Sequence, residues 1–206
     1  MSSAPVKTAA PESAGAETGR GAATRAAILD RGVDLASAEG LEALTIGRLA
    51  SELEMSKSGL FAHFGSKQDL QLAIVDAAAD RFREAVVDPA MEAPDGAARI
   101  RAMAAAYIAH IDSDAYSGGC FWAATSAEYD DRPGPVRDAI AGALDAWLGE
   151  LERQARIAGV AEPERLAFEL YALVMGANSR YRLSGDRRVF GYARDAVEGL
   201  LAELPE

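Results

Sequence analysis

Apolar residues recur at helical spacing along almost the whole chain, and no segment shows the alternation that is typical of a β-strand. This periodicity constrains the fold more than any other feature, because only helices with an apolar stripe can then bury these residues. We therefore predict an all-α protein. The chain has 206 residues, half of them hydrophobic, which is enough for a sizeable core in one or two small domains.

Four start and stop signals divide the N-terminal part of the chain into helices. A helix is expected over residues 24–39, with Gly40 as its C-terminal stop. Thr45, Ser56 and Ser66 each stand directly before an apolar-periodic segment. A hydroxyl at such a position accepts a free N–H of the first helical turn, so each of the three predicts a helix start.

The remainder of the chain is also helical in pattern. The helix that follows Ser66 is expected to run to about Val87 and to be broken by Pro89 and Pro94. Apolar stripes lie on two of its sides, so we expect it to join two packed bodies. Further helices are expected over about 95–112, 120–129, 135–158, 163–183 and 187–204.

The first 21 residues differ from the rest in composition. They are mostly Ala, Gly, Ser, Thr and Pro, without the apolar block of a signal peptide, and we expect a disordered tail. No apolar run approaches the roughly 18 residues of a membrane span, so no membrane partner is expected. The single cysteine, Cys120, excludes an internal disulfide and fits a reducing compartment. A cytoplasmic location is the expectation.

A local reversal of charge marks the helices around Ser56. The chain carries a formal net charge of −11, yet residues 55–68 contain Lys57 and Lys67 and no carboxylate. A capped helix, a short link and a second short helix with polar outer residues occupy 45–64, which is helix-turn-helix spacing. Nucleic-acid binding depends on charge close to the phosphates, so the acidic remainder does not exclude it.

The segment from Thr24 to Leu72 resembles the DNA-binding domain of the tetracycline-repressor (TetR) family. The resemblance is carried by Thr45, Leu49-Ala50, Ser56-Lys57, Leu60-Phe61, His63-Phe64, Ser66-Lys67 and Asp69-Leu70. It implies an N-terminal helix-turn-helix domain joined by a long helix to a C-terminal helical domain for ligand binding and dimerisation. The expected division is a tail over 1–21, a DNA-binding domain over 22–68, and an effector-binding and dimerisation domain over 69–206.

The resemblance also implies which residues meet the DNA. The short helix would enter the major groove, with Lys57, Ser58 and Gly59 nearest the base edges. Thr45, Phe61, His63 and Lys67 would lie nearest the phosphates. The chain departs from the family pattern at two positions: Phe61 replaces the usual Tyr, and Glu54 replaces the usual Gly of the turn. A non-glycine residue in a left-handed turn costs about 1–2 kcal/mol, so the turn either differs or tolerates strain.

The C-terminal part carries two further sets of candidate residues. Mixed aromatic residues with a few polar groups are typical of a small-molecule cavity, although each residue alone fits a core equally well. This effector set is Met103, Tyr107, His110, Phe121, Trp122, Thr125, Trp147, Tyr171, Met175 and Asn178. A two-fold DNA reader needs a two-fold protein, and the apolar stripes of the last two helices either close the protomer core or form a homodimer. The dimer set is Leu170, Val174, Tyr181, Phe190, Ala193, Val197, Leu200, Leu201 and Leu204.

These observations predict a homodimeric DNA-binding transcriptional regulator, most simply a repressor released from a palindromic operator by a small, largely apolar effector. The main alternative is a dimeric helical adaptor that binds a protein partner and no DNA. Catalysis by Cys120 and His110 is disfavoured because no oxyanion motif accompanies them. Glu128, Asp130 and Asp131 could suggest a metal, but beside a Pro-Gly-Pro loop they fit a solvated surface. No enzyme activity, cofactor or metal is expected.

Overall fold

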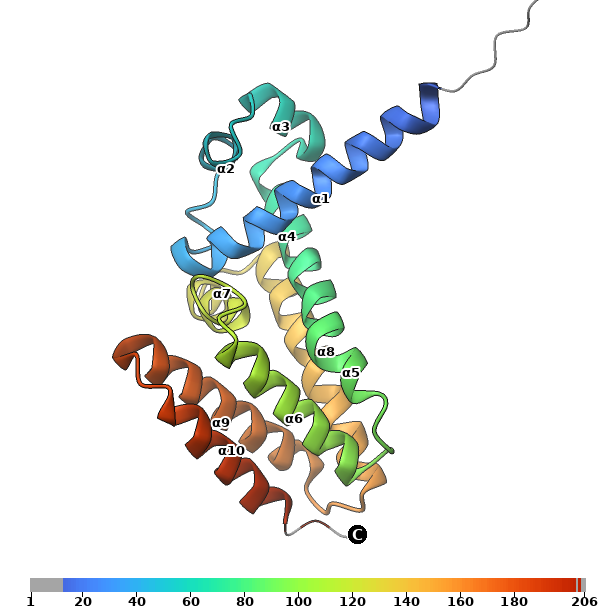
Figure 1. The fold of residues 1–206 in the computed structure, drawn as a ribbon, viewed down its shortest axis with the longest axis vertical. Coiled ribbons are helices and arrows are strands. Elements are labelled where there is room, and N and C mark those ends of the chain that lie inside the picture. The colour runs from blue at the N-terminus through green and yellow to red at the C-terminus, as the bar shows by residue number, and fades with distance from the viewer. Residues whose placement is uncertain (1–12, 203, 205–206) are drawn as a thin grey trace, which may run out of the picture.

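A computed structural model of the protein describes residues 13–202 and 204, and these residues form helices joined by short loops, with no strand among them (Figure 1). The predicted all-α class is confirmed. In chain order the elements are α1 (Ser13–Glu39), α2 (Ile46–Glu52), α3 (Lys57–Phe64), α4 (Lys67–Phe82), the π-helical turn η1 (Arg83–Val87), α5 (Asp88–Ala90), α6 (Ala97–Asp112), α7 (Phe121–Tyr129), α8 (Pro135–Ile157), α9 (Pro163–Ser184) and α10 (Arg188–Leu201).

The three predicted caps all form at the N-terminal end of the molecule. The side-chain oxygens of Thr45, Ser56 and Ser66 each accept the backbone N–H of the residue three positions later, at 3.0 Å. These bonds begin α2, α3 and α4. The three helices and α1 form a head in which α2 and α3 stand on one side of the long α1 (Figure 1).

The first helix is longer than expected. It begins at Ser13 rather than near Thr24, so residues 13–21 are helical and not part of a disordered tail. Three of these nine residues are Ala or Glu, which have high helix propensity, and three are Gly, so they extend a helix that tertiary packing already holds from Ile28 onward. The rest of the expected tail, residues 1–12, lies outside the described residues.

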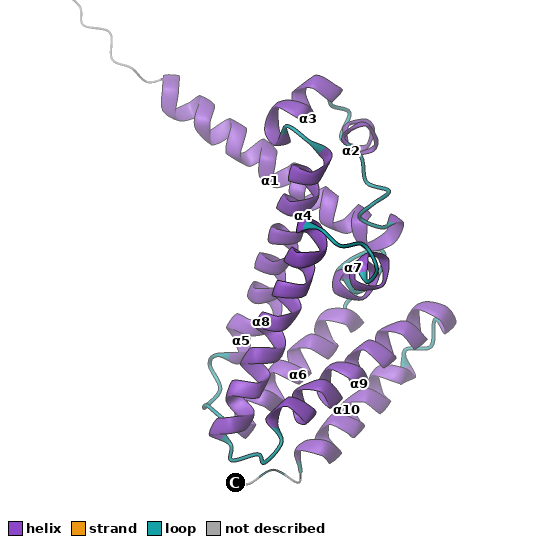
Figure 2. Cartoon of the chain, turned by 180° about the vertical axis from the view of Figure 1, so that it is seen from behind, coloured by secondary structure: helices purple, strands orange, loops and turns teal. Residues whose placement is uncertain are grey.

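The long helix that leaves the head is also different from the expectation. It does not end near Val87 but passes through η1 into α5, which includes Pro89 (Figure 2). Pro89 lies in the first turn of α5, where a missing N–H is tolerated. A π turn contains wider hydrogen-bonded loops than an α-helix and is frequent at functional sites.

The body of the molecule is a bundle below the head. Helix α8 packs against α4 and α9, while α10 packs against α9 and α6, so α9 and α10 form an outer pair (Figure 1). The buried apolar side chains form one core that extends from Ile28 in the head through Ile74 of α4 to Val197 in α10. None of the described helices has the length and apolar character needed to cross a lipid bilayer.

Candidate nucleic-acid interface and effector cavity

The exposed side of α3 brings together several of the predicted DNA-contacting residues. Lys57, Ser58 and Phe61 are exposed, and Phe61 retains 53% of its accessible surface. A shallow hollow lies between this face and the start of α2, where it is bordered by Thr45 and Gly47. The hollow and the exposed first turn of α3 form one continuous surface.

Glycine at position 47 allows Lys57 to lie across the start of α2. A Cβ atom added at Gly47 would stand 3.2 Å from Lys57 Cε, which is tighter than most real contacts. At Gly59, an added Cβ would stand 3.0 Å from the capping Ser56 oxygen. Both glycines therefore keep the backbone close to the surface of the exposed, predicted DNA-contacting side of α3, which we call the reading face.

The turn between α2 and α3 keeps its left-handed residue and so tolerates the strain at Glu54. Glu54 has φ of 54°, and the following residue closes the turn with a hydrogen bond from Met55 N to Ala50 O at 2.9 Å. The helix-turn-helix geometry is thus kept without the glycine that the family usually has. His63 is half-buried beside Phe64, with the two ring centroids 6.2 Å apart.

Lys67, which is expected to lie nearest the phosphates, forms an ion pair within the head. Its Nζ donates to Glu42 Oε1 at 2.6 Å, so the proposed phosphate contact is already paired with a carboxylate. Glu42 Oε2 accepts the hydroxyl of Tyr129 at 3.1 Å, and Gln71 Nε2 donates to the same carboxylate at 3.3 Å. Hydrogen bonding from Lys67, and then from Gln71 and Tyr129, holds the pKa of the Glu42 carboxyl below its usual value.

Helix α7 is joined to the end of α1 by several further contacts, which the sequence analysis also missed. The Glu128 carboxylate accepts Leu41 N at 2.7 Å and Glu42 N at 3.1 Å, so it caps the chain that follows α1 rather than lying in a solvated loop. Just before α7, a Cβ at Gly118 would collide with the backbone of Ser37 at 1.9 Å. Only glycine permits this close approach of the two segments.

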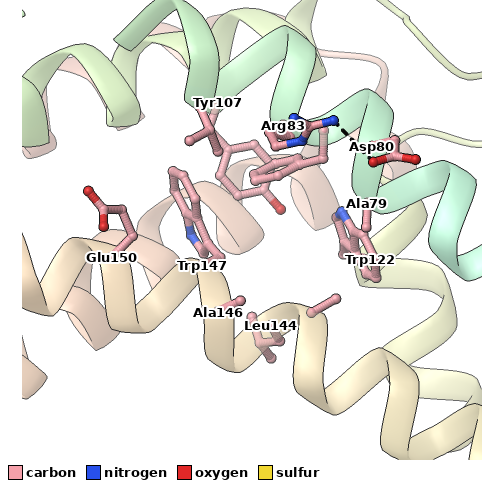
Figure 3. A pocket seen from close by; sticks show the side chains of 12 residues that line it. Ala79, Asp80, Arg83, Tyr107, Trp122, Leu144, Ala146, Trp147 and Glu150 are labelled. Atoms are coloured by element: carbon pink, nitrogen blue, oxygen red, sulfur yellow. Dashed lines mark hydrogen bonds and ion pairs between the residues drawn. The ribbon is translucent and has the colours of Figure 1, made fainter. Parts of the chain in front are cut away.

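A cavity of about 300 Å³ lies in the body between α4 with η1, α6, α7 and α8. Trp122 and Trp147 stand on opposite sides of it, and Leu144 and Ala146 from α8 form one wall (Figure 3). The residues that line it are Ala79, Asp80, Phe82, Arg83, Val87, Tyr107, Trp122, Ala143, Leu144, Ala146, Trp147 and Glu150. Aromatic and aliphatic side chains therefore make most of the lining.

The polar groups of this cavity are few and mostly paired. Arg83 and Asp80 form an ion pair with 3.2 Å between Nη2 and Oδ1, and Glu150 accepts two hydrogen bonds from Arg153. The exception is Trp147 Nε1, which among the described residues is the one buried side-chain nitrogen or oxygen with no hydrogen-bond partner. A buried donor without an acceptor is rare in folded proteins.

Three of the ten predicted effector residues line the cavity: Tyr107, Trp122 and Trp147. The others lie elsewhere. Phe121, Met103 and Thr125 are fully buried in the core. Asn178 Oδ1 accepts Cys120 N at 3.2 Å and so fixes the start of α7. Tyr171 and Met175 lie on α9 and are not part of the lining, although Tyr171 borders a smaller adjacent hollow with Tyr107 and Trp147.

His110 and Cys120 do not meet as a catalytic pair would. His110 borders a separate open depression with Arg81 and Tyr116, and burial lowers its pKa. Cys120 Sγ instead lies 3.3 Å from the Tyr107 hydroxyl, and burial raises the pKa of this thiol. A thiol held in its neutral form is a poor nucleophile.

Most of the predicted dimer residues close the protomer's own core. Between 1% and 5% of the accessible surface remains at each of these six: Leu170, Val174, Phe190, Ala193, Val197 and Leu201. They face inward because α9 and α10 pack against each other and against α6. They are therefore not on the surface of the outer pair, whereas Tyr181, Leu200 and Leu204 are partly exposed.

The outer face of α9 and α10 presents different apolar residues. Phe168 and Leu183 on α9 are 66% and 83% exposed, and Tyr192 on α10 is 63% exposed. Small residues occupy the positions between them on α9, at Ala172 and Gly176. We call this surface, defined by these five residues, the outer face.

Comparisons with known proteins agree on one family. A sequence profile of bacterial regulatory proteins of the tetR family matches residues 28–74, and a profile of the tetracyclin repressor-like C-terminal domain matches residues 96–197. A search of the curated proteins gave no significant match. The two profiles together span the head and most of the body.

Solved structures of the same kind overlay on most of the chain. A TetR transcriptional regulator from Chloroflexus aurantiacus is 21% identical with a TM-score of 0.82, over 89% of this chain and 96% of that one. A TetR-family regulator from Streptomyces coelicolor is 26% identical with a TM-score of 0.77, over 91% and 97%. AibR, solved with isovaleryl coenzyme A and operator DNA, is 21% identical with a TM-score of 0.71, over 85% and 97%. With its capped helix-turn-helix head and helical body, the chain belongs to the tetracycline-repressor family of transcriptional regulators.

Proposed function

We propose that the protein is a dimeric repressor that places α3 of each protomer in the major groove of a palindromic operator. The observation that carries this proposal is the exposed face of α3, with Lys57, Ser58 and Phe61 next to Thr45 at the start of α2. A recognition helix reads bases with residues of its first turns, while neighbouring helix ends hold the backbone. Lys57 and Ser58 are the groups with hydrogen-bonding capacity in that position.

Electrostatics favour selective over general DNA binding. Residues 55–68 contain no carboxylate, whereas the whole chain has 32 acidic and 21 basic residues. Non-specific affinity comes almost entirely from neutralised phosphates. A protein with a strongly acidic net charge therefore gains little from random DNA and depends on base contacts at its reading face.

We propose that dimers form through the outer face of α9 and α10. Three exposed large apolar side chains there, Phe168, Leu183 and Tyr192, would be covered by the same surface of a second protomer. Ala172 and Gly176, which lie between Phe168 and Leu183 on α9, allow helices to approach closely. Such a two-fold contact is self-complementary and matches an operator with two half-sites.

The proposed effector is a small, largely apolar molecule bound in the cavity lined by Phe82, Trp122 and Trp147. Trp147 Nε1 is buried and has no hydrogen-bond partner among the described residues, so a small shift of the indole ring would let an acceptor on this molecule satisfy it. AibR was solved with isovaleryl coenzyme A, a far larger ligand. A cavity of about 300 Å³ lies at the small end of the range for ligand sites.

Release from DNA would follow from a shift of the helix that joins cavity and head. Phe82, Arg83 and Val87 belong to the cavity wall, and α4 begins at Lys67 beside the reading face. The two recognition helices must lie about 34–36 Å apart to fit successive major grooves. An effector that favours another tilt of α4 by 1–3 kcal/mol would weaken operator binding roughly 5- to 150-fold.

Selection of binding sites from random duplexes is the test of this proposal. The expected result is a palindromic site with half-sites one helical turn apart, or a fitting multiple. The alternative function, a helical adaptor for a protein partner, is supported by the loss of a phosphate-binding hydroxyl at Phe61. If repeated selection enriches no sequence, the adaptor is the better account.

A further inference from the structure

The acidic and basic groups at the base of the head form a cluster that neither the reading face nor the cavity explains. Its centre is Glu42, in the loop between α1 and α2, and its cation is Lys67 in the first turn of α4. We call it the Glu42 cluster, and Tyr129 and Gln71 complete it. The side chains of Lys67 and Glu42 keep 38% and 45% of their accessible surface, so the pair is open to solvent and to DNA.

The cluster holds the carboxylate, rather than the lysine, in place. Glu42 is bound by groups from two helices: the Tyr129 hydroxyl of α7 at 3.1 Å and the Gln71 amide of α4 at 3.3 Å. Both partners are buried, and they also bond to each other at 3.0 Å. Glu128 of α7 fixes the same loop by accepting its N–H groups. Lys67 has Glu42 as its only ion-pair partner within 4 Å among the described residues.

We infer that Glu42 competes with DNA phosphates for Lys67, and that Tyr129 of α7 positions Glu42 to do so. This inference rests on the proposed DNA binding. A phosphate that approaches the Lys67 ammonium brings a second anion close to the Glu42 carboxylate, and like charges at such distances repel. Either the lysine leaves Glu42 or the phosphate contact stays weak. The carboxylate therefore lowers operator affinity through Lys67.

Helix α7 gives this competition a connection to the cavity. Trp122, near the start of α7, forms part of the cavity wall, and Tyr129 is the last residue of the same helix. In Figure 1, α7 lies between the end of α1 and the bundle of the body. A displacement of α7 would move the Tyr129 hydroxyl, together with the Glu42 loop that Glu128 holds, relative to Lys67 in α4. Such a movement changes how available Lys67 is to DNA, in either direction, without any change in α3 itself.

The first measurement needs no DNA. The chain has three lysines, so acetylation by a succinimidyl ester can be followed at each one by mass spectrometry. An exposed ion pair shifts an equilibrium by only a few-fold, so Glu42→Gln is expected to raise the acetylation rate of Lys67 about two- to fivefold. Tyr129→Phe is expected to raise it less, and the Lys57 rate serves as the internal reference. Equal Lys67 rates in the wild type and both variants would overturn the inference.

The second measurement is a double-mutant cycle on the selected operator. Glu42→Gln is expected to tighten binding about two- to fivefold, and this gain should disappear in the Lys67→Ala background. Glu54→Gln removes a carboxylate from the same head without touching Lys67 and is the matched control. A gain that persists without Lys67, or that Glu54→Gln reproduces, would show simple charge repulsion and refute the competition. A wild type that selects no duplex would sink the proposed function, and this inference with it, before any variant is compared.

Discussion

Glu54, in the turn between α2 and α3 of the head, has a strained backbone conformation. Its φ of 54° places a side-chain-bearing residue in the left-handed region, at a cost of about 1–2 kcal/mol. Glu54→Gly should relieve this strain, although the added freedom of the unfolded chain offsets about 0.5–1 kcal/mol of the gain. We expect a net stabilisation of up to about 1.5 kcal/mol in urea unfolding. Glu54→Ala removes the same carboxylate but keeps the strain, and an equal gain from it would contradict this account.

The two lysines of the head should have separable effects on DNA binding. Lys57→Ala is expected to cost about 1–3 kcal/mol on the preferred operator and to relax base preference at one position in each half-site. Lys67→Ala should weaken all sequences alike and reduce the salt slope by about one. Titrations at several salt concentrations, on the operator and on point-substituted operators, measure both. Unchanged binding by both variants would mean that α3 docks in another way.

Capping residues could be read from the sequence, whereas the Glu42 cluster could not. Thr45, Ser56 and Ser66 act on residues three positions away, and a local signal is enough to reveal them. Glu42 meets Lys67 and Tyr129 at separations of 25 and 87 residues. Such contacts exist only once α1, α4 and α7 are packed, so no local pattern encodes them.

At the scale of helices, the cavity depends on how four elements meet. The aromatic residues Tyr107, Trp122 and Trp147 were predicted from composition, and each comes from a different helix. The remaining lining includes Asp80 and Arg83, which carry no signal in the sequence that points to a cavity. Periodicity identifies which residues face inward, but it does not tell which inward residues fail to fill the space between helices.

Blocking the cavity gives a direct measure of its role. Nile red, a neutral apolar dye, should bind the wild type with a rise in fluorescence. Ala143→Phe places a ring in the cavity wall and should reduce dye affinity by at least about tenfold, equal to about 1.4 kcal/mol. Ala141→Phe puts the same ring on the exposed side of α8 and should leave dye binding unchanged. Equal dye affinity in all three proteins would place the dye, and by extension the effector, outside this cavity.

At the scale of the whole molecule, α9 and α10 have an inward side and an outward side. The apolar stripes that the hydrophobic pattern assigns to a dimer lie on the inward side. The wide apolar stripe of α10 closes the protomer core, as the burial of Phe190, Val197 and Leu201 shows. The outer face, which is the proposed dimer surface, combines exposed Phe168, Leu183 and Tyr192 with small residues. A pattern of small residues between isolated large ones has low hydrophobic periodicity, so periodicity alone does not single out this surface.

A charge on the outer face should therefore separate dimerisation from folding. Phe168→Glu and Leu183→Glu place carboxylates on side chains that are 66% and 83% exposed in the protomer, so each variant should fold with an unchanged far-ultraviolet spectrum. In a dimer the same carboxylates would be buried without a partner, at a cost of several kcal/mol. Sedimentation should show a dimer for the wild type and a monomer for the variants. Ile157→Glu, at a 52% exposed apolar residue at the end of α8, is the matched control and should remain dimeric.

Because a monomer presents one recognition helix to two half-sites, the variants should also lose at least about tenfold in operator affinity. Dimers of unchanged stability in both variants would move the interface away from α9 and α10.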